Sequence, residues 1–287
     1  MNFINEINQL PSIKNLINDY EIKPLKKLGQ NFILDLNITN NIAKTAICLN
    51  KDIIEIGPGP GGLTRSIFIQ GANSITAIEK DNNSIRSLKG LKNICGEKLH
   101  IIHNDVLNVK LSDLGPFPKS IIANLPYNIS SKLIISWLKE ININKNVLID
   151  DITITIQREL ANKIVCKTGD SNYGRISLIT NLLSEVKKKI ELPPSVFFPK
   201  PNVYSSVIKI TPLKKPRFQV NLSTFEKLTK SAFGNRRKML RQSLKLFGGS
   251  AFLRLANIDD KLRAQDLSTY DFCKLSNLYD DRNFQKL

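Results

Sequence analysis

Residues 52–62 constrain the fold of this chain more than any other stretch. The apolar, β-branched run 52–57 predicts a short buried strand, and a turn rich in glycine and proline separates it from a helix that begins near Leu63. In such a unit the glycines let the backbone approach a ligand, and the helix N-terminus favours negative charge. Glu79 follows the next predicted strand, residues 74–78, where a carboxylate can accept hydrogen bonds from both ribose hydroxyls. The sequence therefore predicts an open α/β sheet that binds a ligand of the nucleotide type.

The glycine-rich turn alone does not distinguish a dinucleotide from S-adenosylmethionine, because a diphosphate and a methionine carboxylate would both suit the helix N-terminus. A third predicted strand, residues 98–103, ends before Asn104 and Asp105. The Asp105 carboxylate could accept a hydrogen bond from an adenine amine there, which favours S-adenosylmethionine. His100 and His103 lie three apart on that strand and point to opposite faces, so they predict no metal site.

A polar, turn-forming heptad, residues 124–130, follows a short apolar run and precedes a predicted helix, residues 131–140. Open α/β sheets bind their ligands at such strand ends. The Asn124 side chain and a backbone carbonyl of Leu125-Pro126 could accept both N–H bonds of an adenine amine, which frees its lone pair, and Tyr127 could stack on a flipped base. Alternatively, the heptad is a Pro-Tyr turn whose asparagine caps the next helix.

The net charge of +17 is the strongest bulk signal. So large an excess of Lys and Arg repels itself unless it meets a polyanion, so nucleic acid is the expected partner. No apolar run approaches the roughly 18 residues of a membrane span, and residues 1–20 lack the pattern of a signal peptide. We expect a cytoplasmic protein with no membrane partner. The four cysteines are far apart and form no Cys-x-x-Cys pair, so neither a zinc site nor a disulfide framework is predicted.

Four motifs, in this order, carry a resemblance to a known family: Gln30-Asn31-Phe32, Glu55-Ile56-Gly57-Pro58-Gly59, the heptad 124–130, and Phe197-Phe198-Pro199-Lys200-Pro201. They resemble the small-subunit ribosomal RNA adenine N6,N6-dimethyltransferase family, from about Lys26 to the C-terminal helices. The resemblance implies a Rossmann-like methyltransferase domain that uses S-adenosylmethionine. It also implies dimethylation of two adjacent adenosines in a hairpin near the 3′ end of small-subunit ribosomal RNA during ribosome biogenesis. The implied partner is that RNA or an immature small subunit, and we expect a monomer.

The resemblance also implies site residues. The implied cofactor contacts are Asn31, Ile33, Gly57, Gly59, Glu79, Asp105 and Asn124. The implied catalytic residues are Asn124, Pro126, Tyr127 and Phe197, with the Phe197 ring facing the target base opposite Tyr127, although the adjacent phenylalanine could equally be the core residue. This chain departs from the family in places: Ile33 replaces a usual Leu, and Asn202 and Tyr204 replace a common Lys and Asp. The family also normally has Thr and Asn near Met239 and Gln242.

Residues 214–217 predict a linker between two domains, for which 287 residues are ample. We expect a methyltransferase domain over residues 21–212, a small all-α RNA-binding domain over residues 217–287, and an extension over residues 1–20 with no site signal. In the second domain, apolar residues fall on one face of a predicted helix between residues 233 and 247. The basic residues beside them are predicted to bind RNA phosphates, although a charged band can also be a solvated face: Arg237, Lys238, Arg241 and Lys245.

Three alternatives remain open. A large-subunit ribosomal RNA adenine methyltransferase of the antibiotic-resistance type has a similar Asn-x-Pro-Tyr turn, usually with Ile where this chain has Leu125. A DNA adenine methyltransferase tends to carry an acid before Pro-Pro-Tyr. A non-catalytic ribosome-assembly factor would retain the fold, but the intact Asn124 and Tyr127 favour activity.

Overall fold

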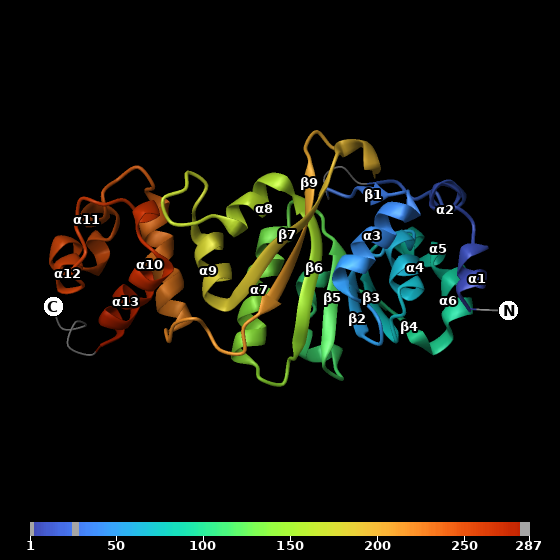
Figure 1. The fold of residues 1–287 in the computed structure, drawn as a ribbon, viewed down its shortest axis with the longest axis horizontal. Coiled ribbons are helices and arrows are strands. Elements are labelled where there is room, and N and C mark those ends of the chain that lie inside the picture. The colour runs from blue at the N-terminus through green and yellow to red at the C-terminus, as the bar shows by residue number, and fades with distance from the viewer. Residues whose placement is uncertain (1–2, 25–28, 282–287) are drawn as a thin grey trace. The chain divides into compact units, whose positions relative to one another are not determined.

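The computed structural model describes residues 3–24 and 29–281 of the chain (Figure 1). Contacts between Cα atoms divide it into two compact units. The first unit comprises Met1–Ala161 and Val186–Pro212, and the second comprises Asn162–Glu185 and Leu213–Leu287. The N-terminal extension therefore groups with the first unit, and part of the expected methyltransferase domain groups with the C-terminal helices.

The core of the first unit is a mainly parallel sheet in the order β4-β3-β2-β5-β6-β9-β7, to which β7 adds its first two residues from the second unit. The pairs β2–β3, β2–β5, β3–β4 and β5–β6 are parallel, whereas β6 and β9 are antiparallel. The three strands predicted around the nucleotide site are confirmed as β2, β3 and β4. The strands are β2 (Asp52–Ile56), β3 (Ser74–Glu79), β4 (Leu99–His103), β5 (Lys119–Asn124), β6 (Ile149–Gln157), β7 (Ser184–Leu192) and β9 (Ser205–Pro212).

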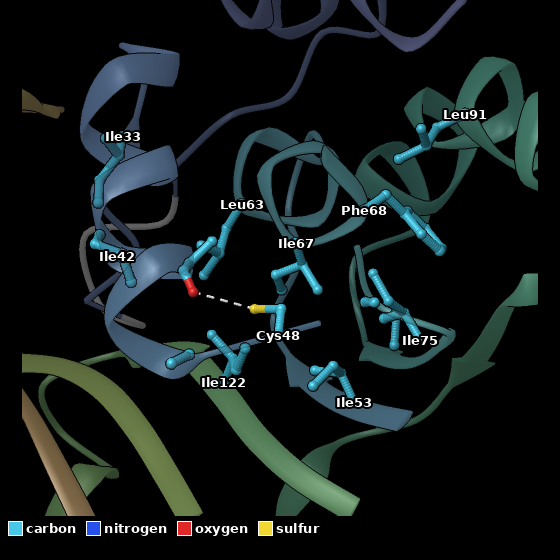
Figure 2. Close-up of a cluster of buried hydrophobic side chains, with 14 of the residues drawn as sticks. Ile33, Ile42, Cys48, Ile53, Leu63, Ile67, Phe68, Ile75, Leu91 and Ile122 are labelled. Carbon is cyan, nitrogen blue, oxygen red and sulfur yellow. Dashed lines mark hydrogen bonds between the residues drawn. The ribbon is translucent and has the colours of Figure 1, made fainter. Parts of the chain in front are cut away.

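Helices between the strands cover the sheet, and their apolar faces explain why the short β-branched strands are buried. Ile53 and Ile122 point from β2 and β5 toward Ile42 on α3 and Ile67 on α4 (Figure 2). The Cys48 thiol lies in this cluster and donates to the Ala43 carbonyl at 3.2 Å. The helices of the first unit after the N-terminal pair are α3 (Leu36–Ala46), α4 (Gly62–Ile69), α5 (Asn82–Ser87), α6 (Lys89–Cys95), α7 (Ser130–Ile143) and α8 (Arg158–Val165), the last of which ends in the second unit.

The N-terminal extension forms two short helices, α1 (Phe3–Asn8) and α2 (Ile13–Asp19). The buried Arg65 guanidinium of α4 donates to the Pro11 carbonyl at 2.8 Å, between the two helices. Apolar side chains of α2 pack against Phe32 and its neighbours. The extension is therefore part of the core of the first unit.

A second, two-stranded sheet joins segments that are far apart in the sequence. Strand β1 (Phe32–Ile33) pairs antiparallel with β8 (Phe197–Phe198). Phe32 lies opposite Phe198, and Ile33 lies opposite Phe197. The first and fourth sequence motifs are therefore neighbours in space.

The second unit is mainly helical, and it corrects one prediction. Helix α10 ends at Gly234, and the segment before Leu240 is not helical, so no continuous helix runs from 233 to 247. Leu240 and Arg241 instead donate backbone hydrogen bonds to the carbonyls of Leu262 and Asp260, at 2.7 and 3.1 Å. These tertiary bonds replace those of the helix. The α-helices are α9 (Arg175–Leu183), α10 (Leu222–Gly234), α11 (Leu240–Ser243), α12 (Gly249–Leu255) and α13 (Thr269–Asp280).

None of the helices in the described residues is long and apolar enough to span a membrane. Residues 3–24 and 29–281 also contain no group of three or more His, Cys, Asp or Glu side chains that could hold a metal ion.

Candidate active site

A pocket opens at the carboxyl ends of β2, β3, β4 and β5, where open α/β sheets bind their ligands. It holds about 700 Å³ of empty space, open solvent included. Most of the predicted cofactor residues meet there, although they come from segments up to 93 positions apart. The lining residues are Gly29, Gln30, Asn31, Phe32, Ile56, Gly57, Ile78, Glu79, Lys80, Asn104, Asp105, Val106, Asn124, Pro126, Asn128 and Ile129.

Glu79 lies at the end of β3 and is 5% exposed. Its carboxylate accepts backbone hydrogen bonds from Gly59 at 3.1 Å, Lys80 at 2.8 Å and Asp81 at 2.9 Å. Burial raises the pKa of Glu79 above its usual value, and the three N–H groups oppose that shift. Glu79 therefore ties the glycine-rich turn to the next strand as well as lining the pocket.

The glycines of the turn leave room beside the pocket. A Cβ added at Gly57 would meet nothing within 4 Å, and Gly57 has φ +65°, in the region that favours glycine. A Cβ at Gly59 would lie 2.7 Å from the Phe32 ring, so only glycine allows the turn to pass so close to β1. These observations fit a ligand that approaches the backbone at Gly57.

Asp105 lies on the β4 side of the pocket and is partly exposed. One carboxylate oxygen accepts from the Leu107 N–H at 2.9 Å, and the other lies 3.4 Å from the Lys80 ammonium. Asp105 therefore starts a short 3₁₀ helix while its second oxygen faces the Lys80 ammonium. The predicted acid of the third strand thus lies in the same pocket as Glu79.

Asn124 is the last residue of β5. Its side-chain Nδ2 donates to the Asn31 carbonyl at 2.7 Å, so the first and third motifs are joined directly. Because this bond holds the NH₂ end of the amide, the Oδ1 end remains as the acceptor, and no described residue donates to it. The side chain does not cap a helix, since α7 begins only at Ser130 and makes no bond to it.

The acceptor predicted in the Leu125-Pro126 backbone can be narrowed to one of the two carbonyls. The Pro126 oxygen accepts from the Ser130 hydroxyl at 2.8 Å and from the Ile129 N–H at 3.3 Å, so both lone pairs are used within the turn. The Leu125 N–H donates to the Thr155 carbonyl at 3.2 Å, and no described residue donates to the Leu125 oxygen. The Leu125 carbonyl is therefore the acceptor that the turn leaves available beside Asn124.

Tyr127 is half-buried, and its hydroxyl makes a hydrogen bond of 2.7 Å with the Ser205 hydroxyl at the start of β9. Burial raises the pKa of Tyr127 above its usual value, and the bond to Ser205 opposes that shift. Sequence reasoning missed Ser205, because nothing in the sequence links two hydroxyls 78 positions apart.

The position predicted for Phe197 also needs a correction. Phe197 is 5% exposed and packs in the core cluster, whereas Phe198 is 45% exposed. Adjacent residues of a strand point to opposite faces, and the ring of Phe197 points to the buried face. Ile33 is buried opposite Phe197 and lines a smaller pocket next to Gly57 and Leu63.

The four predicted RNA contacts are exposed on the second unit. Lys238, Arg241 and Lys245 line one open depression together with Gln242 and residues 248–250. Arg241 lies 3.8 Å from Asp260, so one of these charges is partly neutralised. Arg236, in contrast, points inward and donates to the carbonyls of Ser171 and Tyr173.

A glycine turn, the Glu79 carboxylate and an Asn-Leu-Pro-Tyr turn therefore meet at one edge of a parallel sheet. This fold and site define the class of S-adenosylmethionine-dependent methyltransferases that act on an amine nitrogen. The family model described as ribosomal RNA adenine dimethylase matches residues 23–281. The chain belongs to the ribosomal RNA adenine dimethylase family, and its methyl donor is S-adenosylmethionine.

Curated relatives match nearly the whole chain. Ribosomal RNA small subunit methyltransferase A of Bartonella henselae is 41% identical over 276 residues, which cover 95% of this chain and 99% of the relative. The protein of the same name from Sinorhizobium medicae is 40% identical over 272 residues, which cover 94% of this chain and 98% of the relative.

Two solved structures share the fold. A dimethyladenosine transferase from Plasmodium falciparum has a TM-score of 0.68 at 23% identity and covers 84% of this chain and 94% of its own. The 23S rRNA methyltransferase ErmE has a TM-score of 0.63 at 23% identity, and the match covers 87% of this chain and 100% of that chain. These likenesses confirm the predicted Rossmann-like fold.

Proposed function

We propose that this enzyme dimethylates the N6 amines of two adjacent adenosines in a hairpin near the 3′ end of small-subunit ribosomal RNA, during ribosome biogenesis. The observation that carries the proposal is the fixed Asn124 amide, whose nitrogen is bound to the Asn31 carbonyl and whose oxygen is left to accept. The names of relatives that span the chain support the choice of the small subunit.

The chain's own residues would orient the target amine. The Asn124 oxygen and the Leu125 carbonyl would each accept one N–H of the adenine N6, which leaves the nitrogen lone pair free to attack. Bound S-adenosylmethionine supplies an electrophilic methyl group. Because the donor is strong, alignment of the amine contributes more than proton removal, and no strong general base is required.

Other side chains would hold the cofactor and the base. Glu79 and Asp105 would accept hydrogen bonds from the ribose and the adenine of the cofactor, and Gly57 would let it approach the backbone. Asn31 and Ile33 would complete that site. The Tyr127 ring, oriented by its bond to Ser205, would stack on the extruded target base.

The second unit would supply much of the affinity for RNA. Its exposed Arg237, Lys238, Arg241 and Lys245 would contact phosphates, and the net charge of +17 would speed the encounter with a polyanion. Within this proposal the protein acts as a monomer in the cytoplasm. Residues 21–212 would carry out the chemistry, and residues 217–287 would bind RNA.

The test is transfer of labelled methyl from S-adenosylmethionine to purified, unmodified small and large ribosomal subunits, followed by nucleoside analysis of the digested RNA. Dimethyladenosine in the small subunit alone is the expected result. Label in the large subunit would contradict the proposal and favour a resistance-type activity. Binding to the small subunit without transfer of label would favour the alternative of a non-catalytic assembly factor.

A further inference from the structure

The loop between β8 and β9 presents apolar side chains to solvent at the edge of the active site. Phe198 is 45% exposed, Val203 is 43% exposed and Tyr204 is 44% exposed, and Lys200 lies between them on the surface. Aromatic and β-branched side chains so exposed, with a lysine among them, are typical of surfaces that meet unpaired nucleic acid bases.

Both ends of this loop are attached to active-site residues. At one end Phe198 pairs with Phe32, which lines the cofactor pocket. At the other end Ser205 bonds to the Tyr127 hydroxyl at 2.7 Å. Residues 199–204 therefore continue the surface on which the proposed target base would lie.

Tyr204 has a cationic partner. The Arg158 guanidinium carbon lies 4.5 Å from the centre of the Tyr204 ring, and the backbone N–H of Arg158 donates to the Tyr204 carbonyl at 2.9 Å. Arg158 also lies 3.8 Å from Glu191, which is itself 2.9 Å from Lys188. Glu191 helps to hold the Arg158 guanidinium near the Tyr204 ring. Because Arg158 and Lys188 together carry more charge than Glu191 neutralises, this surface is positive and suits a phosphate.

We propose that Tyr204 and Arg158 form a stacking site for an unpaired nucleotide next to the target adenosine, with the base on the exposed surface of the Tyr204 ring and its phosphate near the Arg158 guanidinium. The inference rests on the proposed function, because it takes the substrate to be RNA whose target base is extruded at Tyr127. A flipped base leaves its neighbours unstacked on one side, and an aromatic side chain can replace the lost partner.

The experiment compares three variants of the full-length protein with the wild type: Tyr204→Ala, Tyr204→Leu and Tyr204→Phe. The steady-state rate is measured against small-subunit RNA concentration, with S-adenosylmethionine saturating. Loss of one stacked base corresponds to about 5- to 150-fold in affinity. Tyr204→Ala and Tyr204→Leu should therefore raise the KM for RNA by about that factor and leave kcat nearly unchanged, while Tyr204→Phe should behave as wild type.

A second measurement follows the base directly. A hairpin of the substrate sequence with 2-aminopurine on either side of the target adenosine is titrated with wild type and with each variant. Fluorescence at one flanking position should fall when the wild type binds and should stay high with Tyr204→Leu. Equal quenching by wild type and Tyr204→Leu, or an unchanged KM in Tyr204→Ala, would overturn the stacking site.

Controls separate this inference from the proposed function. Cofactor affinity by calorimetry and the melting temperature should be the same in all four proteins, since Tyr204 touches neither the cofactor pocket nor the core. A Tyr204→Phe variant as weak as Tyr204→Ala would show that the hydroxyl, and not the aromatic face, matters, and would refute stacking. If the wild type itself methylates no small-subunit RNA, the proposed function fails independently of Tyr204.

Discussion

The sheet edge of the first unit and the basic surface of the second hold their functional side chains in opposite ways. At the sheet edge, Asn124, Glu79 and Tyr127 are each fixed by hydrogen bonds to groups from other segments. On the second unit, Lys238 and Lys245 are long, exposed side chains, and Arg241 has one loose ion pair at 3.8 Å. The first region therefore fixes the positions of its side chains, and the second presents positive charge without fixing it.

The difference predicts how each region responds to substitution. Fixed, partly buried groups act at one defined place, so losing one that contacts the reacting amine should reduce the reaction sharply and with little dependence on salt. Exposed cations contribute modest, screened interactions that are close to additive. Four experiments test these expectations and the stability of the first unit.

The largest effect is expected from Asn124→Ala. Loss of a single preorganised polar group at a reacting centre typically costs about 10²- to 10³-fold in kcat, and that is the expected loss of methyl transfer. Cofactor affinity, measured by calorimetry, should fall much less, because only the bond to the Asn31 carbonyl is lost from that site. Asn128→Ala is the matched control, since Asn128 lines the same pocket without a proposed role in the chemistry. Unchanged turnover in Asn124→Ala would remove the amine-orienting role.

The second effect concerns stability and pH. Burial raises the pKa of Glu55 from 4.5 to about 8, and the Thr64 hydroxyl opposes this only in part. Between these values the unfolded chain has lost the Glu55 proton and the folded chain keeps it, so the free energy of unfolding should fall as pH rises, by at most about 1.4 kcal/mol per pH unit.

Glu55→Gln should remove that slope. At pH 7 the variant should be more stable than the wild type by up to about 3 kcal/mol, and the advantage should vanish near pH 4, where both side chains are neutral. Urea unfolding across this range measures the difference. A gap that does not depend on pH would show that Glu55 is not the group responsible.

A smaller, salt-dependent effect is expected from Lys238→Gln with Arg241→Gln. Two exposed contacts should contribute about 0.5 to 2 kcal/mol to RNA affinity at moderate salt. The slope of log affinity against log salt should fall by about one unit for each lost phosphate contact. Lys44→Gln with Lys110→Gln removes the same charge from exposed positions of the first unit. An equal change in this control would show that RNA affinity depends on the total charge of the protein and not on the basic surface of the second unit.

The smallest effect is expected at the Tyr127–Ser205 bond. A hydrogen bond between two hydroxyls contributes about 1 kcal/mol, so Ser205→Ala and Tyr127→Phe should each lower kcat/KM by a few-fold. Combining the two substitutions should cost no more than either alone, because both remove the same bond. Strictly additive losses would show that the hydroxyls act separately.

Much of the site could be predicted because its residues end short apolar strands. Glu79 and Asn124 end apolar strands, Asp105 follows closely after a third strand, and the carboxyl ends of parallel strands share one edge. The two neighbouring residues Phe197 and Phe198 show where prediction from the sequence ends. Both have the same local sequence preference, and only the partner strand β1 decides which ring is inside.

The helical unit was harder to predict for a related reason. The period of apolar residues from 233 to 247 is compatible with one helix, but Gly234 and Asn235 weaken it. Backbone bonds from Leu240 and Arg241 to the Asp260–Leu262 segment then stabilise a broken path. The periodicity of apolar residues predicts which side chains are buried. It does not predict which backbone groups form hydrogen bonds with distant segments.

The α/β class, the order of the motifs and the residues that end the strands can be predicted from the sequence, because burial and strand length depend on local composition. Three features depend on the folded chain: Pro126 has no free carbonyl, Ser205 holds Tyr127, and Phe198, not Phe197, faces solvent. The physical reason is that a hydrogen bond or a buried face is a property of two groups, and most of these pairs join segments that are distant along the chain.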